Sequence, residues 1–387
     1  MPLATDVDIT PAGQRPDEDP SLAVRNNGGT PPSADPAPSG RREALLVLGF
    51  GGPEGPDDVM PFLENVTRGR GIPRERLLDV AEHYMHFGGV SPINEQNRAL
   101  TAAVERELAA AGLDLPVYWG NRNWSPYVEH VWQQMADDGI EHVYVFPTSG
   151  FASWSGCRQY HEDVARARSV FTGAAPGGGP TAEKLPHYGD HPGFVQANAE
   201  ALAAALASLP DDLRDTARLV ATAHSIPDTM AAVAGPDGGA YQAELLRSAR
   251  LVVDAVAPGR DVDLVWQSRS GPPSVPWLEP DVNDHLQALA AAGEKAVVVF
   301  PIGFVSDHVE VIWDLDNEAK ETAEELGMAF VRAATAGTHP AFVAMVRELV
   351  EERRSGTPPR LGTNCPAACC FVRRPAGLHR GQEPSPA

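Results

Sequence analysis

The chain has 387 residues, of which 52 are acidic and 31 are lysine or arginine, so its formal net charge is −21. This balance argues against a nucleic-acid-binding protein, because binding to phosphates depends on clustered lysine and arginine. It also disfavours docking on an anionic membrane through a basic patch. With a hydrophobic content of 43% and no apolar run near about 18 residues, the chain is neither disordered nor transmembrane. Four cysteines are too few for a disulfide framework, and no secretory signal precedes them, so we expect a cytoplasmic protein.

Both ends of the chain are rich in proline and glycine. Residues 1–42 and 371–387 carry too little apolar surface to offset the entropy of ordering, and we expect both to be disordered. The first of these segments also lacks the basic and apolar regions of a targeting peptide. About 330 residues remain between them, enough for a sizeable core.

Short unbroken apolar runs that end in glycine- or proline-containing loops recur along the chain. We expect strands at 44–50, 116–119, 142–147, 218–223, 263–266 and 296–301. Unbroken runs are typical of parallel strands covered on both faces. Helical patterns lie between them, at 97–111, 125–138, 194–208, 241–256 and 281–292. This alternation predicts a doubly wound α/β architecture.

The predicted elements occur in two similar sets. The motif Trp-x-x-Arg stands at a strand end at 119–122 and again at 266–269, and in each set a helix then leads to a strand that closes with Phe-Pro. Chance similarity between strand–loop units is the weaker explanation. We therefore expect two related Rossmann-like lobes, 43–190 and 191–345, each a parallel sheet flanked by helices, with a cleft between them.

One histidine occupies a position that favours chemistry. His224 directly follows the strand predicted at 218–223, and open α/β sheets bind their ligands at the carboxyl ends of the strands. Imidazole accepts protons near neutral pH. The alternative is a structural histidine, since the chain has 12 of them.

An acidic pattern follows the strand predicted at 296–301. Glu310, Asp314 and Glu318 are spaced by four in the segment 304–318, which has the pattern of a helix start. Like charges at this spacing destabilise a helix by roughly 0.2–0.5 kcal/mol per pair. Hard oxygen ligands for a divalent cation would explain that cost. The alternative is that these acids face water and favour the helix dipole.

Two short motifs suggest anion binding. Arg68 belongs to Thr-Arg-Gly-Arg at 67–70, and Ser91 belongs to Gly-Gly-Val-Ser-Pro at 88–92. Arginine binds carboxylates bidentately and glycine-rich turns expose backbone N–H groups, although neither motif is specific. The sequence contains no Walker A loop or Rossmann dinucleotide fingerprint, which argues against nucleotide chemistry.

Three of the four cysteines lie in a C-terminal segment, 346–370. They are Cys365, Cys369 and Cys370, whereas Cys157 lies far upstream. Four thiolates match the ligand set of a [2Fe–2S] cluster or of a structural zinc ion. The spacing is not a standard ferredoxin or zinc-ribbon pattern, and cysteines that bind nothing remain the alternative.

Six motifs, found in the same order, together resemble the ferrochelatase family over residues 43–345. They are Leu-Gly-Phe-Gly-Gly-Pro at 48–53, Thr-Arg-Gly-Arg at 67–70, Phe-Gly-Gly-Val-Ser-Pro-Ile at 87–93, Thr-Ala-His-Ser-Ile-Pro at 222–227, Trp-Gln-Ser-Arg at 266–269 and the segment 303–316. The resemblance is closest to the actinobacterial members, which act on coproporphyrin III and carry a [2Fe–2S] cluster. It implies a lyase that inserts Fe²⁺ into coproporphyrin III to give coproheme, late in haem biosynthesis.

The resemblance also implies roles for individual residues. His224 and Glu310 would face each other across the porphyrin as the catalytic pair and as ligands of the substrate iron, and Asp314 and Glu318 would lead the metal inward. The porphyrin-binding positions of the family match Phe50, Arg68, Ser91 and Tyr160, and its cluster ligands match Cys157, Cys365, Cys369 and Cys370.

Two positions depart from the family pattern. Phe50 stands where many soluble bacterial relatives have a tyrosine that can ligate iron, and a phenyl ring cannot. His83 stands where some relatives have an arginine near a propionate, which puts that contact in doubt.

Partners and alternatives follow from the same resemblance. We expect a monomer that binds the porphyrin and Fe²⁺, with no nucleic acid, no transmembrane segment and at most transient contact with neighbouring enzymes of the haem pathway. The enzyme alternatives are a ferrochelatase for protoporphyrin IX and a cobalt or nickel chelatase for another tetrapyrrole. A haem carrier or iron–sulfur sensor is the non-enzyme alternative, and the joint presence of His224 and the acidic stripe counts against it.

Overall fold

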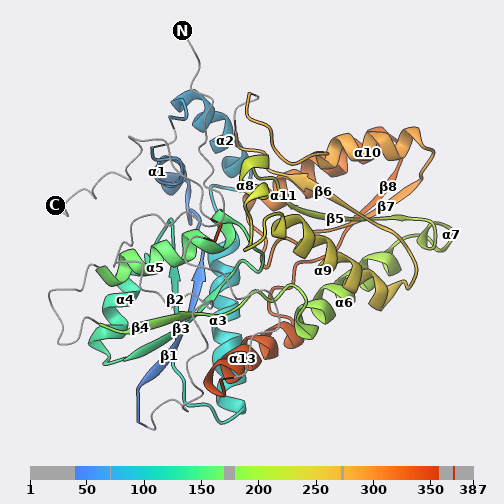
Figure 1. Cartoon of the computed structure of the whole chain (residues 1–387). Helices are drawn as coiled ribbons and strands as arrows, with labels where there is room; N and C mark the ends of the chain where they lie inside the picture. The colour runs from blue at the N-terminus through green and yellow to red at the C-terminus, as the bar shows by residue number, and fades with distance from the viewer. Residues whose placement is uncertain (1–39, 70, 170–178, 272–273, 357–368, 371–387) are drawn as a thin grey trace.

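The computed structural model describes residues 40–69, 71–169, 179–271, 274–356 and 369–370 (Figure 1). The extension predicted at 1–42 therefore lies outside the described residues except for 40–42, and the tail predicted at 371–387 lies wholly outside them.

Two four-stranded parallel sheets form the framework (Figure 1). The first has the order β2-β1-β3-β4 and consists of β1 (Glu43–Gly49), β2 (Val117–Asn121), β3 (His142–Pro147) and β4 (Thr181–Lys184). The second has the order β6-β5-β7-β8 and consists of β5 (Arg218–His224), β6 (Val262–Gln267), β7 (Ala296–Phe300) and β8 (Ala329–Arg332). The predicted fold class, two related parallel-sheet lobes, is confirmed.

The repeat extends into the loops. The peptide bonds Ser125–Pro126 and Glu279–Pro280 are both cis, and they lie in the loops that follow β2 and β6. In each lobe the tryptophan of the Trp-x-x-Arg motif pairs with the central strand, Trp119 with Val47 and Trp266 with Ala223.

Helices connect the strands and cover both sheets. In chain order they are α1 (Pro56–Val66), α2 (Arg74–His86), α3 (Ile93–Ala110), α4 (Val128–Asp137), the π-helix η2 (Trp154–Arg158), α5 (Gln159–Ser169), α6 (Pro192–Ser208), α7 (Asp211–Arg214), α8 (Asp228–Ala232), α9 (Ala240–Val256), α10 (Val282–Ala291), α11 (Val309–Ile312), the π-helix η3 (Trp313–Ala319), α12 (Lys320–Glu325) and α13 (Pro340–Arg354). The five helices predicted from the sequence correspond to α3, α4, α6, α9 and α10. Among the described residues, no helix combines the length and the apolar character needed to cross a membrane.

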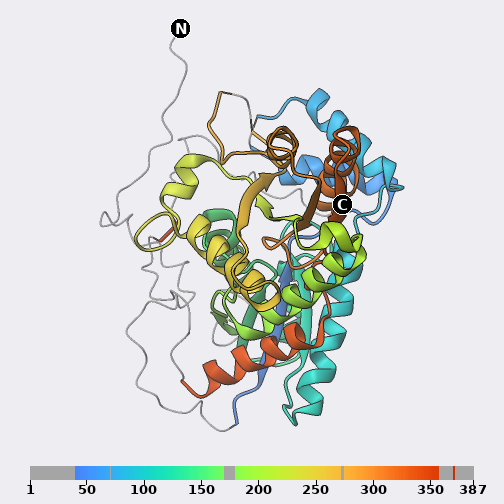
Figure 2. The same cartoon turned by 90° about the vertical axis from the view of Figure 1, so that its right-hand side faces the viewer.

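One hydrophobic core joins the two lobes. It contains Val47 of β1, Phe300 of β7 and Phe342 of α13, all at most 1% exposed. After the second sheet the chain returns to the first, because α13 packs against both α3 and α6 (Figures 1 and 2). A shared core fixes the carboxyl ends of the two sheets relative to each other.

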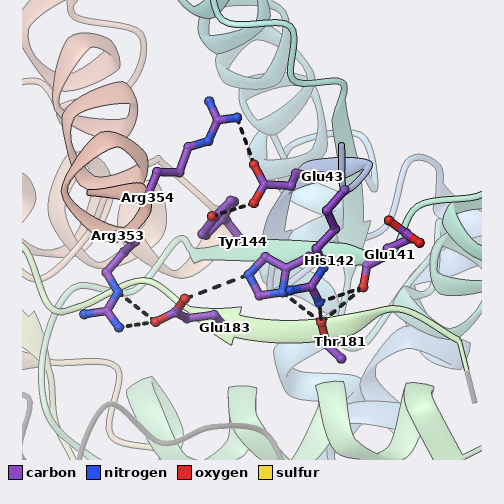
Figure 3. Close-up of polar contacts among 9 residues, drawn as sticks. Glu43, Glu141, His142, Tyr144, Thr181, Glu183, Arg353 and Arg354 are labelled. Atoms are coloured by element: carbon purple, nitrogen blue, oxygen red, sulfur yellow. Dashed lines mark hydrogen bonds and ion pairs between the residues drawn. The ribbon is translucent and has the colours of Figure 1, made fainter. Parts of the chain in front are cut away.

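The end of α13 is anchored on the first sheet by charged groups (Figure 3). Arg353 Nε donates to Glu183 Oε1 at 2.7 Å, and Arg354 Nη2 lies 2.9 Å from Glu43 Oε2. Tyr144 also donates to Glu43, at 2.9 Å, and burial together with this carboxylate raises the pKa of Tyr144. Glu43 begins β1, so the anchor lies at the edge opposite the carboxyl ends of the strands.

Candidate active site

The structure brings together the histidine and the first acid of the predicted pattern. His224 is the last residue of β5, and Glu310 lies in α11, which follows the neighbouring strand β7. His224 Nε2 is 3.6 Å from Glu310 Oε2, and the two side chains are 34% and 43% exposed. The pair therefore stands at the carboxyl end of the second sheet, where a ligand can reach it.

Hydrogen bonds orient the His224 ring. Its Nδ1 is 2.5 Å from the carbonyl oxygen of Ser225, which can only accept, so Nδ1 carries a proton and Nε2 is the atom that gains or loses one. Tyr241 donates to the His224 carbonyl at 2.9 Å and fixes the backbone. Burial lowers the pKa of His224, but the Glu310 carboxylate, the hydrogen bond to the Ser225 carbonyl and the charge of Asp314 together raise it, so this pKa stands above its ordinary value. The ring is therefore placed to exchange protons on the side that faces Glu310.

The second acid, Asp314, lies against the end of β6. It accepts hydrogen bonds from Gln267 Nε2, at 3.3 Å, and from the Ser268 hydroxyl. Ser268 has φ of 61°, a left-handed conformation that is uncommon for a residue with a side chain. Burial, aided by the charge of Glu310, raises the pKa of Asp314 to about 7. This carboxyl group therefore changes its charge near neutral pH.

The third acid, Glu318, is held by Trp313, whose Nε1 donates to Glu318 Oε1 at 2.8 Å. The prediction of a regular helix from residue 304 is wrong in detail. A helix begins only at Val309, and from Trp313 to Ala319 it widens into a π-helix. Within this π-helix, Asp314 bonds to residues at the end of β6, whereas Glu318 bonds to Trp313 of the π-helix itself. π-Helical turns are frequent at functional sites.

The first lobe contributes its own helices to this site. Phe62 of α1 and Tyr84 of α2 share a hydrophobic cluster with Val309, the residue before Glu310. Burial and the charge of Glu310 raise the pKa of Tyr84. The α1–α2 pair thus packs against the start of the acidic segment.

The four predicted porphyrin-binding residues all lie in the first lobe. Phe50 follows β1, is 38% exposed and packs edge-on against Phe62, with the ring centroids 6.4 Å apart. Ser91 is buried, its backbone N–H bonded to the carbonyl of Pro53 at 2.8 Å, whereas Arg68 is exposed just beyond α1. Tyr160 is only 3% exposed, and the Arg122 guanidinium lies 4.4 Å from its ring centroid.

Two of the four predicted cluster cysteines lie together. Cys369 and Cys370 are buried and their sulfur atoms are 3.7 Å apart, and the Gly235 N–H donates to Cys370 Sγ at 3.1 Å. Two thiolates on one tetrahedral metal with bonds of about 2.3 Å stand about 3.8 Å apart, so this pair fits two ligands of an iron or zinc ion. Cys365 lies outside the described residues. Within the described part of the chain, no three or more His, Cys, Asp or Glu side chains are arranged to hold a metal ion.

Cys157 lies in the π-helix η2 and is buried. Burial raises the pKa of its thiol, but Lys184, His187 and His161 together lower it, so this pKa lies well below its ordinary value. A thiolate is the form that binds metals.

The residues that hold Asp314 and Glu318 were not predicted from the sequence. Gln267 and Ser268 lie inside the second Trp-x-x-Arg motif, so the position of this motif at a strand end could have identified them. Trp313 gave no signal of its own, because its contacts depend on the π-helix.

The His224 imidazole stands beside the Glu310 carboxylate, and Asp314 and Glu318 follow Glu310 in the same segment. An imidazole can accept protons and a carboxylate oxygen suits a divalent cation, so the chemistry open to this pair is proton transfer next to a cation ligand.

Comparison with known proteins agrees with this chemistry. The family model described as Ferrochelatase matches residues 42–354. The coproporphyrin III ferrochelatase of Nocardia farcinica is 58% identical over 355 residues, 87% of this chain and 99% of that protein. The enzyme of the same name from Streptomyces coelicolor is 52% identical over 362 residues, 88% of this chain and 96% of that protein. Among solved structures, SirB from Bacillus subtilis with Fe3+ is 14% identical, with a TM-score of 0.48 over 81% of this chain and 97% of that one.

Proposed function

This chain belongs to the ferrochelatase family and is an enzyme that inserts a metal into a porphyrin, and from this premise we propose that its substrates are Fe²⁺ and coproporphyrin III. The relatives that are 52–58% identical over most of the chain bear the name coproporphyrin III ferrochelatase, which supports this substrate. The observation that carries the proposal is the pair formed by His224 and Glu310, with 3.6 Å between Nε2 and Oε2.

Insertion of iron replaces two pyrrole protons by one cation. The site must therefore accept protons and hold Fe²⁺ close to the ring nitrogens. His224 Nε2 is the proton acceptor in this proposal, because Nδ1 is committed to the Ser225 carbonyl. Glu310 receives the cation as a hard oxygen ligand, and its charge stabilises the imidazolium that forms.

The remaining acids supply the metal. Asp314 and Glu318 follow Glu310 in the same segment, and all three carboxylates are partly exposed or exposed. A cation that moves from Glu318 through Asp314 to Glu310 exchanges one set of oxygen ligands for another. The high pKa of Asp314 means that a proton can replace the cation there near neutral pH.

The first lobe binds the porphyrin in this proposal. Phe50 offers an exposed aromatic face to the macrocycle, and Arg68 and Ser91 offer polar groups to its carboxylates. Tyr160 is the fourth position, and its burial requires that a neighbouring side chain move before it can touch the ring. Because Phe50 cannot ligate iron, the iron of the product is held by His224 alone.

We extend the proposal to a [2Fe–2S] cluster on Cys157, Cys365, Cys369 and Cys370. The 3.7 Å between the sulfur atoms of Cys369 and Cys370 and the low pKa of the Cys157 thiol support it. The cluster would supply stability and takes no part in the proton and metal transfers. Anaerobically purified protein should contain iron and acid-labile sulfide, and Cys369→Ser should lose both. Stoichiometric zinc without sulfide would instead assign a structural zinc site.

One kinetic experiment tests the proposed reaction. Fe²⁺ is added anaerobically to the protein with coproporphyrin III or protoporphyrin IX, and the metalloporphyrin spectrum is followed. We expect faster insertion with coproporphyrin III, and losses of at least about 100-fold in His224→Ala and Glu310→Ala, because each removes a proton-transfer or cation-binding group. A preference for Co²⁺ with sirohydrochlorin, or porphyrin binding without insertion, would overturn the proposal.

We also propose that the protein works as a monomer in the cytoplasm. Sedimentation at micromolar concentration and fractionation of the cells that produce it test these two points.

A further inference from the structure

One guanidinium binds two carboxylates at the edge of the active site. Arg332 ends β8, and its Nη1 and Nη2 donate to the two carboxylate oxygens of Asp307 at 3.0 and 3.4 Å. Its Nε and Nη2 donate to the two oxygens of Asp316 at 2.6 and 2.8 Å. The Arg332 side chain is only 15% exposed, so water competes weakly for these bonds. Bidentate pairing of this kind fixes both the position and the orientation of a carboxylate.

The two carboxylates flank the acids of the active site. Asp307 precedes Glu310 by three residues, and Asp316 follows Asp314 by two. The chain between them consists of the four-residue helix α11 and the first part of the π-helix η3. His308, at the start of α11, gives no capping hydrogen bond through its side chain, and π-helical turns are rare and short in proteins. The local backbone therefore needs support from outside, and the Arg332 bonds supply it at both ends.

We call the bridge that Arg332 forms between Asp307 and Asp316 the clamp. Both lobes hold it in place. On its own side, Arg332 pairs in register with Val299 of β7, and Ala333 N–H donates to the Val299 carbonyl at 2.8 Å. On the other side, Gln96 of α3 accepts from the Asp307 N–H at 2.8 Å. Asp307 is thus fixed by the second lobe through its side chain and by the first lobe through its backbone.

The clamp also distinguishes the acids that pair with Arg332 from the acids that are available to a cation. Glu310 and Glu318 both raise the pKa of Asp314, so negative charge is already concentrated here. If Asp307 and Asp316 carried uncompensated charge, they would add to this repulsion and compete for the cation. Pairing with Arg332 compensates one of their two negative charges and engages oxygens of both carboxylates, so Glu310, Asp314 and Glu318 remain as the oxygen ligands.

We propose that Arg332 is a positioning residue for metal delivery: by joining Asp307 to Asp316 it holds Glu310 and Asp314 where they receive the divalent cation. The inference rests on the proposed function for the identity of the cation, but the geometry that it describes requires only that a cation bind here.

The test compares three variants. Arg332→Met removes the clamp, and Arg332→Lys keeps the charge but cannot bind two carboxylates bidentately. Arg218→Met is the matched control, because Arg218 pairs with Asp263 at 2.7 Å in a partly buried site at the opposite end of the second sheet. The readouts are the KM values for Fe²⁺ and for porphyrin, and calorimetric binding of Mn²⁺ without porphyrin, since Mn²⁺ prefers oxygen ligands to thiolates.

We expect Arg332→Met to raise the KM for Fe²⁺ and to weaken Mn²⁺ binding by about tenfold or more, with the KM for porphyrin changed by less than about twofold. Arg332→Lys should recover part of both losses, and Arg218→Met should match the wild type. Asp316→Asn serves as a second, milder variant if Arg332→Met does not fold. It should raise the KM for Fe²⁺ and weaken Mn²⁺ binding by smaller factors, again with little change in the KM for porphyrin.

Two results would overturn the inference. In the first, Mn²⁺ binding and the KM for Fe²⁺ are unchanged. In the second, Arg218→Met shows the same losses as Arg332→Met, which would make the clamp a general support of the fold. A wild-type protein that inserts no iron, while Mn²⁺ binding still depends on Arg332, would refute the proposed function and leave the positioning role intact.

Discussion

Trp313 of the second lobe lies flat against His83 of the first lobe, with ring centroids 4.1 Å apart and ring planes 10° apart. The same indole donates to Glu318 at 2.8 Å. One side chain therefore joins the two lobes and holds the outermost acid of the proposed metal path. Burial lowers the pKa of His83, so at neutral pH this stack joins an uncharged imidazole to the indole.

Replacement of Trp313 separates these two roles. Trp313→Phe keeps an aromatic ring to stack on His83 but has no N–H for Glu318, so we expect a KM for Fe²⁺ raised about two- to fivefold. Its melting temperature should fall by less than that of Trp313→Ala, because the lost hydrogen bond is exposed to water and contributes little net stability. Trp313→Ala loses the stack as well, and its melting temperature should fall by several degrees. Equal Fe²⁺ kinetics in both variants and the wild type would show that Glu318 does not need the indole.

The candidate active site has an acid, Asp314, whose charge changes near neutral pH. The pKa of Asp314 is raised to about 7, chiefly by burial, so the carboxylate form dominates above pH 7 and the neutral acid below it. Only the carboxylate binds a cation well. We therefore expect the KM for Fe²⁺ to rise as the pH falls from 8 to 6, by about tenfold per pH unit once Asp314 is mostly protonated.

Asp314→Asn is the control for this pH dependence. The amide imitates the neutral acid at every pH, so its KM should be high and nearly independent of pH between 6 and 8. It should also melt at a higher temperature than the wild type at pH 8, because burying an ionised carboxylate with a raised pKa destabilises the fold above that pKa. If Asp314→Asn retained the pH dependence of the wild type, another group would be responsible.

The parts of this structure that could be predicted from sequence are those in which a local pattern suffices. Strands β1 and β7 are buried along their whole length and appear as unbroken apolar runs. Strand β4 (Thr181–Lys184) and strand β8 (Ala329–Arg332) were not predicted, because four residues that include charged side chains carry no such pattern. Both are edge strands, placed by their pairing with a neighbour.

The candidate active site likewise contains one part that could be predicted from the sequence and one that could not. His224 could be located because a strand end has a sequence signal. The π-helix could not, because regular spacing by four residues at Glu310, Asp314 and Glu318 predicts an α-helix. The wider turn is accompanied by tertiary contacts, such as that between Asp314 and Ser268, which join segments far apart in the chain.

The duplicated Trp-x-x-Arg motif serves different purposes in the two lobes. Arg122 and Asp163 form an ion pair in which both side chains are 3% exposed, whereas Arg269 is 36% exposed and pairs with Glu279 at 3.7 Å. In the first lobe the motif supports the interior beneath Tyr160, and in the second it borders the proposed metal path through Ser268. We therefore expect the first copy to govern stability and the second to affect activity.

Single and double replacements of Arg122 and Asp163 test whether the first copy of the motif governs stability. Asp163→Asn leaves the Arg122 charge buried without its counter-charge and should lower the free energy of unfolding by about 3–5 kcal/mol, measured in urea. Arg122→Met with Asp163→Leu removes both charges and should recover much of that loss, because Arg166, which also pairs with Asp163, keeps its ion pair with Glu129. The exposed pair of Arg74 with Glu64, whose side chains are 64% and 49% exposed, is the control, and Glu64→Gln should change stability by less than about 1 kcal/mol. If the double variant were no more stable than Asp163→Asn, the loss would come from packing around Tyr160 and not from the unpaired charge.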